Sequence, residues 1–508
     1  MLACRSDEEG LIGEPTTGPV KRGGIFHMGS TTSAMSIDPH TEVTMGLTYI
    51  CFIYGYLLHQ VQEESGPTLY YDHAVSLEQP EELTYLFKMR SGVRFQNLPP
   101  VNGREVTAQD VEYTFKRIAA NQATPFWTKK ILEMAAIDDS SFRVRIDSPY
   151  AYTMGEFGGI RTAIVPHEAV EQWGDLRANG VGSGPFQIGK FSRNSGIEMV
   201  KNPEYYVEGI PYVDGITNQT IPDDSSLMAA FKAKQLDVYG PPSKIQAENV
   251  ASFSPHVLVS KNPSLSIFMI NLNEIAAPVL QDQRVREALD IALDRDAMIE
   301  KLAFGDGNYT GPVSWGLEFW SLPQDELRQR FRRDVGKARQ LLEAANQSDL
   351  KLQLKFPSGP TSDLAAMMKE HWQEAGIEIE MLPMELGTWI SDLYSQKFEL
   401  MVGGGLPYGD ENLPLQFNHT NNWTRVQAPV RLPEPEIDAL LDRLPVTPDI
   451  DKRQKLALEV TRKILDRHGP FLYLYAPYGY TAVWDHLHGY EDVNPQLLAY
   501  TYNMWLDK

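Results

Sequence analysis

The stretch from Leu83 to Ile118 constrains the fold of this chain more than any other segment. Residues Leu83 to Met89 alternate with a period of two, which predicts a β-strand with one apolar face. A turn and a second strand, starting at Val93-Arg94-Phe95, are expected next. Thr107 then offers an N-cap hydroxyl with the carboxylate of Asp110 three residues on, and apolar residues follow at helical spacing, at Val111, Phe115 and Ile118. The segment therefore predicts a β-β-α unit.

The amino-acid sequence of this segment also resembles that of a known protein family. The run NGREVTAQDVEYTFKRI resembles the signature of family 5 extracytoplasmic solute-binding proteins, the oligopeptide, dipeptide and nickel group that feeds ABC importers. Four further segments resemble other blocks of the same family and occur in the expected order. They are residues 180–191 (GVGSGPFQIGKF), 200–206 (VKNPEYY), 282–307 and 452–475. Together these blocks cover nearly the whole chain.

The resemblance implies a particular domain organisation. The expected fold is α/β, a two-lobed periplasmic-binding-protein-like fold with an extra subdomain inserted in the first lobe. Carried onto this chain, residues 1–22 are a lipoprotein tether, 23–270 the first lobe, completed by 480–508 and with the subdomain inserted at about 66–184, and 271–479 the second lobe. Two crossings between the lobes would make a hinge and a cleft that closes.

One part of the second lobe can be read from periodicity alone. Residues 350–356 and 377–381 alternate as strands, a helix stopped at Gly376 lies between them, and another helix leads to a third strand at 398–402. Strand-helix-strand-helix-strand with short connections predicts a parallel sheet with right-handed crossovers. The helices expected at 282–293 and 294–304 would cover this sheet.

Charge and apolar content exclude several classes of partner. The 508 residues include 46 Lys and Arg against 67 Asp and Glu, a net charge of −21, so nucleic acid and anionic membrane surfaces are poor partners. No run of 18 apolar residues is present, so nothing in the sequence predicts a membrane span.

The two cysteines have different expected roles. Cys51 lies in an apolar stretch and is expected to be a buried thiol, although a bridge to Cys4 stays open at this point. Cys4 follows Met-Leu-Ala and precedes a polar tail, which resembles the end of a bacterial lipoprotein signal with Cys4 as the lipidated residue. The resemblance thus implies a bacterial protein that is a lipid-anchored monomer, in the periplasm or at the outer face of the cytoplasmic membrane. Its implied partners are an ABC permease and ATPase.

A search for catalytic and cofactor motifs is largely negative. Ser183 lies between glycines but not in a G-x-S-x-G spacing, and its glycines are expected to permit a tight turn. Zinc, EF-hand and phosphate-loop motifs are not met, and His468, His486 and His488 are more often satisfied groups than ligands. We therefore expect no enzyme activity, no cofactor and no metal, with a secreted hydrolase as the alternative from another class.

The candidate ligand site is the segment that follows the third strand of the parallel sheet. Ligands of open α/β sheets bind beyond the carboxyl ends of strands, and glycine lets a ligand approach the backbone. The aromatic side chains Trp315, Trp320, Trp389 and Trp423 near turns and helix starts could line a cleft. The candidate ligand contacts are Gly403, Gly404, Gly405, Leu406, Pro407, Tyr408, Asp410, Trp320, Trp389, Thr32 and Ser33.

Two departures from the family pattern leave the ligand open. The peptide-binding relatives carry an Asp before a Tyr-like position, where this chain has Pro407 before Tyr408, with Asp410 nearby. Gly55 and Tyr56 take the places of Glu and Gly in the family's Tyr-Glu-Gly-Leu-Leu. The expected ligand is a peptide-like or other small organic solute; the alternatives are an oligosaccharide, an opine or a metal chelate.

Overall fold

A computed structural model of the chain describes residues 4–5, 19–41, 46–63, 66–120, 130–359, 361–405, 412–420, 433–490 and 503–508. Its residues group into two compact units. The first unit comprises 1–242, 246–260 and 480–508, and the second 243–245 and 261–479. Among the described residues, none of the helices combines the length and the apolar character that a membrane crossing needs.

Within its described residues, the first unit contains four small sheets. Their strands, in the order in which neighbours pair, are β1 (Cys4–Arg5), β4 (Gly66–Tyr71) and β3 (Leu58–Glu63); β2 (Ile25–Ser30), β11 (Gly215–Thr220), β10 (Gly196–Lys201) and β9 (Phe186–Ser192); β5 (Ala74–Glu81), β6 (Thr84–Met89), β8 (Ser141–Ile146) and β7 (Ile131–Asp138); and β20 (Leu487–His488) with β21 (Trp505–Leu506). The helices of this unit are α2 (Gly46–Ile53), α3 (Ala108–Ala120), α4 (Thr153–Phe157), α5 (His167–Trp173), α6 (Asp224–Lys232) and α7 (Lys244–Ala251), which begins in the second unit.

The predicted β-β-α unit is confirmed for its first strand and its helix, but the prediction of a second strand at residues 93–95 is wrong. Strand β6 pairs antiparallel with β5 and β8, and Phe87 on its inner face is fully buried. Helix α3 contacts β7 and β8 of the same sheet, and Thr107 donates its backbone N–H to Asp110 at 2.9 Å. Residues 93–95 form no strand, because only Arg94 makes an isolated bridge, to Glu105.

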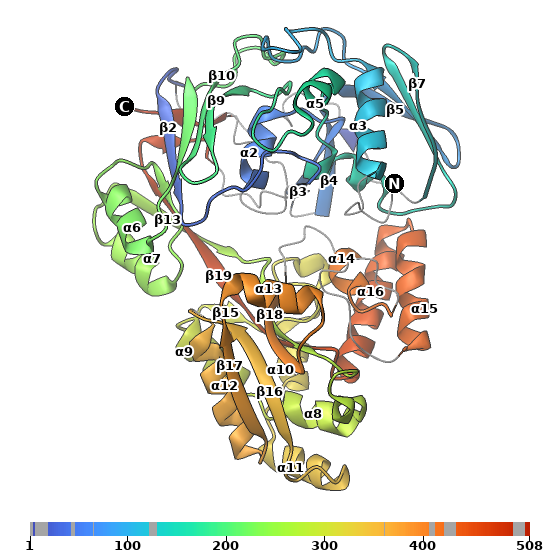
Figure 1. Cartoon of the computed structure of the whole chain (residues 1–508), viewed down its shortest axis with the longest axis vertical. Helices are drawn as coiled ribbons and strands as arrows, with labels where there is room; N and C mark the ends of the chain where they lie inside the picture. The colour runs from blue at the N-terminus through green and yellow to red at the C-terminus, as the bar shows by residue number, and fades with distance from the viewer. Residues whose placement is uncertain are drawn as a thin grey trace. The chain divides into compact units, whose positions relative to one another are not determined.

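An eight-stranded sheet dominates the second unit (Figure 1). Its order is β12 (Val238–Tyr239), β19 (Phe471–Trp484), β14 (Ile267–Leu272), β18 (Leu400–Gly405), β16 (Lys351–Pro357) and β17 (Glu378–Met384), with β13 (Val257–Pro263) and β15 (Gly307–Asn308) also pairing with β19. Strand β19 runs on into the first unit, where its last residues pair with β12.

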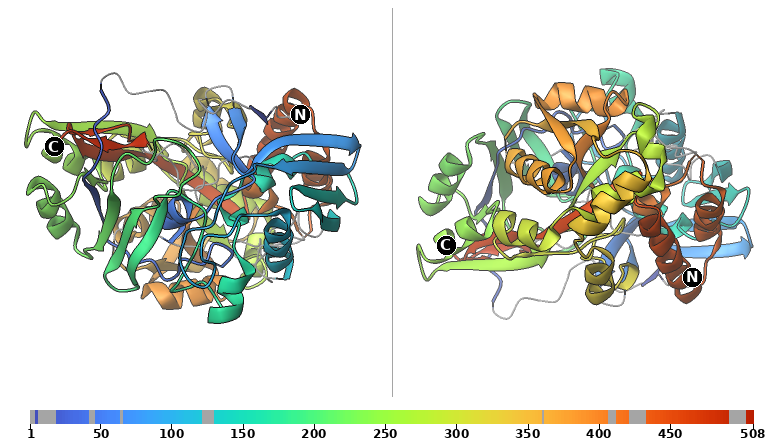
Figure 2. Two further views of the ribbon diagram at one scale, coloured as in Figure 1. Left: turned by 90° about the horizontal axis from the view of Figure 1, so that it is seen from above. Right: turned by 90° about the horizontal axis from the view of Figure 1, so that it is seen from below.

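The predicted parallel arrangement is confirmed within this sheet. Strand β16 pairs in parallel with both β17 and β18, and Leu354 lies opposite Met381 and Leu400. Helix α12 (Ser362–Glu374) packs on β16 and β17, and α13 (Leu386–Tyr394) contacts β16, as the orange ribbons of Figures 1 and 2 show. Helices α8 (Gln283–Ile291) and α9 (Arg295–Leu302) add apolar residues to the same core, as expected.

The remaining helices of the second unit, apart from α11, contribute to a separate core around α16. They are α10 (Gln324–Arg330), α11 (Val335–Ala344), α14 (Asn412–Gln416), α15 (Pro435–Arg443) and α16 (Ile450–Asp466). Helix α16 buries Leu456, Val460 and Ile464 at helical spacing, in a cluster that also holds Trp320. Helix α11 instead packs on α8.

Candidate functional site

The three predicted glycines lie inside β18, which corrects the expectation that they follow the strand as a loop. Gly403, Gly404 and Gly405 pair antiparallel with Met269, Phe268 and Ile267 of β14. The periodicity of 398–402 gave no reason to extend the strand, because glycine has no side chain to alternate. Instead, β18 continues through the glycines because its backbone pairs with β14. The two strands are distant in the chain: the paired residues Asn271 and Met401 are 130 positions apart.

Two neighbouring glycines of β18 have opposite surroundings. A Cβ on Gly403 would fall under 3.0 Å from Nδ2 of Asn271, whose amide donates to the carbonyl of Met401 at 3.3 Å. Gly403 is buried, so a side chain there has no room. Gly404 is exposed, and among the described residues a Cβ on it would meet the carbonyl oxygen of Ile267 alone, at 3.4 Å, an ordinary contact. Gly404 is thus an exposed strand residue at which a side chain would contact little else of the described chain.

The other candidate residues of the second unit have varied surroundings. Trp320 is 1% exposed and packs edge-to-face against Phe319 in the α16 core, so its burial favours a packing role. Trp389 lies on α13 with its indole nitrogen shielded from solvent. Helix α13 has no fully buried residue among its nine. The candidates Leu406, Pro407, Tyr408 and Asp410, and Trp423 with them, lie outside the described residues.

Thr32 and Ser33 follow β2 in the first unit after one intervening residue. The carbonyl of Thr32 accepts a hydrogen bond from the Ser30 hydroxyl at 2.8 Å, and the Ser33 hydroxyl lies 3.4 Å from Oγ1 of Thr220. Thr32 is exposed and Ser33 half-buried, so both are reachable from solvent. Their ligand contact stays a prediction.

The glycines of residues 180–184 allow close packing rather than a turn, which corrects the sequence interpretation. A Cβ on Gly182 or Gly184 would fall under 3.0 Å from the backbone of Ile53, and the Gly184 N–H donates to the Ile53 carbonyl at 2.9 Å. None of these glycines has a positive φ. This segment therefore lies directly on the backbone that carries Gly55.

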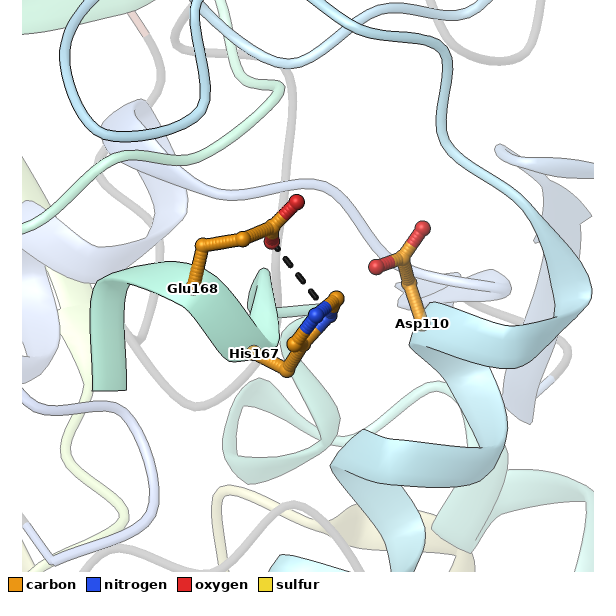
Figure 3. A group of neighbouring side chains, drawn as sticks. All are labelled: Asp110, His167 and Glu168. Carbon is orange, nitrogen blue, oxygen red and sulfur yellow. Dashed lines mark ion pairs between the residues drawn. The ribbon is translucent and has the colours of Figure 1, made fainter. Parts of the chain in front are cut away.

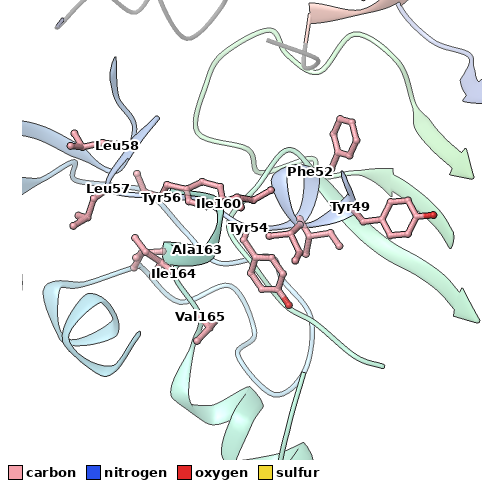
Figure 4. Close-up of a cluster of buried hydrophobic side chains, with 14 of the residues drawn as sticks. Tyr49, Phe52, Tyr54, Tyr56, Leu57, Leu58, Ile160, Ala163, Ile164 and Val165 are labelled. Atoms are coloured by element: carbon pink, nitrogen blue, oxygen red, sulfur yellow. The ribbon is translucent and has the colours of Figure 1, made fainter. Parts of the chain in front are cut away.

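Gly55 sits in a densely packed part of the first unit. Figure 4 shows the buried side chains on either side of it, including Tyr54 and Tyr56, beside Ala163, Ile164 and Val165. The Ile164 N–H donates to the Gly55 carbonyl at 2.8 Å. Where the family has a glutamate, this chain has no room for any side chain.

The space at Gly55 is filled by His73. A Cβ on Gly55 would fall under 3.0 Å from both Cε1 and Nε2 of His73, and 2.8 Å from the Ser183 hydroxyl oxygen. His73 Nε2 lies 2.7 Å from that oxygen, and His73 Nδ1 lies 2.9 Å from Oδ1 of Asp72. All three polar residues are fully buried. An ionised Asp72 can only accept, so Nδ1–H donates to it and Nε2 accepts from Ser183 when the imidazole is neutral.

The ionisation of Asp72 is fixed by its neighbours. Burial alone would raise the pKa of Asp72, but the imidazoles of His73 and His59 outweigh it and hold the pKa well below its usual value. His59 Nε2 lies 2.9 Å from Oδ2 of Asp72, the Tyr56 N–H donates to the same oxygen at 2.8 Å, and the Tyr206 hydroxyl donates to Oδ1.

The sequence analysis found no nucleophile with a base and an orienting carboxylate, whereas the structure brings Ser183, His73 and Asp72 into that order. A working triad also needs a nucleophile that a substrate can reach and donors for an oxyanion. Ser183 is 1% exposed, and the adjacent N–H of Gly184 is already bonded to Ile53. The arrangement is therefore a buried structural network. The missing side chain at Gly55 was the only sequence signal for it.

One cluster resembles a metal site in composition. Asp110, His167 and Glu168 place their ligand atoms within 4.8 Å of one another (Figure 3). Arg104 already bridges the two carboxylates, with Nη2 2.6 Å from Oδ1 of Asp110 and 2.7 Å from Oε2 of Glu168. Hydrogen bonding to Arg104 lowers the pKa of Glu168. A fixed guanidinium supplies the positive charge that a metal would bring, so the cluster is an ion-pair network.

His468, His486 and His488 are satisfied groups, as expected, and Cys51 is a thiol, as expected, but less buried than predicted. His468 Nδ1 lies 2.7 Å from Asp290, His486 Nε2 lies 2.8 Å from Asp237, and the ring of His488 stacks on Trp505. Cys51 is a half-buried thiol that donates to the Thr48 carbonyl at 3.1 Å, and burial raises its pKa to about 12.

Comparisons with known proteins identify the family of the chain. The family model described as Bacterial extracellular solute-binding proteins, family 5 Middle, matches residues 68–424. The chain is 24% identical over 459 residues to the oligopeptide-binding protein AppA of Bacillus subtilis, covering 83% of this chain and 80% of AppA.

Solved structures show the same fold. The periplasmic binding protein DppA from Helicobacter pylori, in complex with the peptide STSA, superposes with a TM-score of 0.81 at 21% identity, covering 96% of this chain and 99% of DppA. AgaA from A. tumefaciens R10, in complex with agropinic acid, gives a TM-score of 0.80 at 19% identity, with 96% and 99% covered. The expected α/β periplasmic-binding-protein fold is thereby confirmed.

Proposed function

The chain belongs to the bacterial extracellular solute-binding proteins of family 5, and on that premise we propose that it closes two lobes over a peptide-like or other small organic solute and delivers it to an ABC permease. Members of this family are non-enzymatic solute-binding proteins of ABC transport systems, which excludes the hydrolase alternative. A ligand favours closure when some of its contacts exist only in the closed conformation, because binding then shifts the equilibrium from the open to the closed conformation.

Similarity favours peptides as the ligand class. AppA is named for oligopeptides and covers most of this chain, and DppA was solved with a tetrapeptide. A second candidate is an opine-like ligand, because AgaA has almost the same fold similarity and holds agropinic acid. An oligosaccharide or a metal chelate is a weaker alternative.

The glycine at position 55 affects the choice between these ligand classes. The resemblance places a glutamate at this position in relatives, and here His73 fills the space. A carboxylate at this place is therefore unavailable to a ligand ammonium group. A peptide would need another acid, and Asp410 is the candidate from the sequence.

The observation that carries the candidate ligand site is the exposed backbone of Gly404 in the middle of the second unit's sheet. A side chain at any non-glycine residue would shield this backbone, whereas glycine leaves it open to the main chain of an extended ligand. The amphipathic helix α13, with exposed Leu386, Ile390 and Tyr394, belongs to the same βαβ unit and offers apolar surface.

The ligand itself can be identified directly. The purified protein is denatured and the released small molecules are analysed by mass spectrometry, then confirmed by calorimetry with the refolded protein. Recovery of a peptide supports the peptide class; recovery of an opine or a metal chelate replaces that class with the corresponding alternative.

Replacement of Gly404 by valine tests the site. The fold tolerates the substitution, so a side chain at Gly404 should act on the ligand and weaken its affinity by about 1–3 kcal/mol, roughly 5- to 150-fold. Calorimetry with the identified solute measures the change. The matched control is Gly189→Val in β9, another exposed strand glycine, whose Cβ would meet the Glu198 carbonyl at 3.3 Å.

Two outcomes of this comparison decide the assignment. Gly189→Val should leave the affinity unchanged, and Gly404→Val should unfold at nearly the wild-type temperature. Unaltered binding by a folded Gly404→Val protein would show that the backbone at Gly404 does not contact the ligand.

The location of the protein is extracytoplasmic, as for the family. We propose in addition that Cys4 is lipidated and anchors the chain to the outer face of the cytoplasmic membrane. A diacylated cysteine supplies the two chains that stable attachment needs.

A further inference from the structure

The chain passes between its two compact units at four points. These lie at residues 242–243, 245–246, 260–261 and 479–480. Strand β13 contains the third point, strand β19 contains the fourth, and α7 begins beside the first two. We call the residues 243–245, 261–264 and 476–479, on the second-unit side of these points, the crossing segments.

All three crossing segments bind a single residue of the second unit, Asp306. The Lys261 ammonium lies 2.9 Å from Oδ1 of Asp306, and the Lys244 ammonium lies 3.5 Å from the same oxygen. The backbone of Asp306 takes part as well, because its carbonyl accepts the N–H of Tyr478 at 3.0 Å.

Asp306 is itself held firmly by the turn that ends α9. Its N–H donates to the Ala303 carbonyl at 2.8 Å, and the N–H of Gly305 donates to Ile299 at 3.0 Å. Phe304 and Gly305 both have positive φ, which fixes the turn in a conformation that few residues adopt. Strand β15 follows at once and pairs with Pro477 and Ala476 of β19.

Further contacts hold the ammonium groups of Lys261 and Lys244 near Asp306. The Lys261 ammonium also lies 3.9 Å from the ring centre of Tyr478, and Lys244 donates to the Phe304 carbonyl at 3.2 Å. The Tyr478 ring packs edge-on against Trp315, whose indole N–H donates to the Ala476 carbonyl at 3.3 Å. The Asp306 side chain is only 12% exposed, whereas the side chains of Lys244 and Lys261 are 36% and 41% exposed, so solvent and salt still reach the lysine side of these pairs.

From this convergence we propose that Asp306 is an electrostatic clamp that limits how far the crossing segments bend on the second unit. The clamp itself is a property of the ligand-free chain. Its consequence for binding rests on the proposed function, since a looser clamp eases closure only if the units close over a solute. Asp306 is a positioning residue in this role and contacts no ligand.

The test compares Asp306→Asn with a matched control by hydrogen exchange of the ligand-free protein. Asparagine keeps the shape of Asp306 and its backbone carbonyl but removes the charge. Asp392→Asn is the control, because Asp392 has a similarly shielded carboxylate 2.6 Å from the ammonium of one lysine, Lys355, within the second unit. Peptides that contain the amides of Ser264 and Tyr478 report on the crossing segments, since these amides donate to Pro477 and Asp306.

Exchange at these two amides should be about tenfold faster in Asp306→Asn than in the wild type and unchanged in Asp392→Asn. In about 1 M salt the wild type should approach the variant, because screening weakens the pairs. Exchange within twofold of the wild type, or a variant effect that salt does not reproduce, would overturn the clamp.

The clamp and the proposed function can fail separately. Small-angle scattering of the wild type with and without the identified solute tests closure and does not depend on Asp306. Faster exchange in Asp306→Asn together with an unchanged scattering radius would support the clamp and reject closure.

Discussion

Gly55→Ala is the sharpest test of the buried network in the first unit. The added methyl would fall under 3.0 Å from the His73 ring and 2.8 Å from the Ser183 hydroxyl oxygen, in a region that is fully buried. The ring must move, because the backbone of Gly55 is held from the other side by the bond from Ile164. The substitution therefore separates His73 from Ser183.

The magnitude follows from two contributions. Adding a methyl to a packed core typically costs about 1–3 kcal/mol. Leaving a buried donor or acceptor unsatisfied costs about 1–3 kcal/mol more. We expect Gly55→Ala to lower the free energy of unfolding by about 2–6 kcal/mol, and the melting temperature by about 4–24 °C for a large domain.

Differential scanning calorimetry measures the effect, with Gly159→Ala as the control in the same unit. Gly159 has a φ of −72°, and a Cβ on it would meet the nearest atom, the Glu156 carbonyl oxygen, only at 3.6 Å. Its replacement should change stability by less than about 0.5 kcal/mol.

A double-mutant cycle identifies the cause. In a His73→Ala background the space of the ring is vacant, so Gly55→Ala should cost less by about 1–3 kcal/mol than in the wild type. Additive effects, or a Gly55→Ala protein as stable as the Gly159→Ala control, would refute the steric argument.

Two further predictions concern pH and the membrane anchor. Burial, and then the Arg117 guanidinium, lower the pKa of His40 to about 4. An unfolded histidine titrates near 6.5, so between these two pH values the unfolded chain binds more protons than the folded chain. The free energy of unfolding should therefore fall by up to about 3 kcal/mol as the pH drops from about 6.5 to 4. Urea unfolding across this range should lose that slope in His40→Gln, and parallel curves would contradict the assignment. Cys4 should carry the acyl mass in protein extracted from bacterial membranes, and Cys4→Ser protein should be released; a membrane-bound Cys4→Ser protein would exclude the anchor.

The sequence by itself determined the local elements and the family. Alternation in 350–356 and 377–381 predicted β16 and β17, and their short helical connections predicted parallel pairing, because side-chain period and connection length are local properties. Asp282 and Asp294 likewise cap α8 and α9, where the sequence placed helix starts. The family blocks predicted the fold that comparisons confirm.

Only the tertiary structure decided what the glycines and buried polar residues do. Gly403 belongs to a strand because β14 pairs with it, and Gly182 is needed because the backbone of Ile53 lies against it. Ser183 is far from Asp72 and His73 in the sequence, 110 positions after His73. Their contacts depend on long-range packing, and a residue without a side chain leaves no periodic pattern, so neither could be deduced from the chain alone.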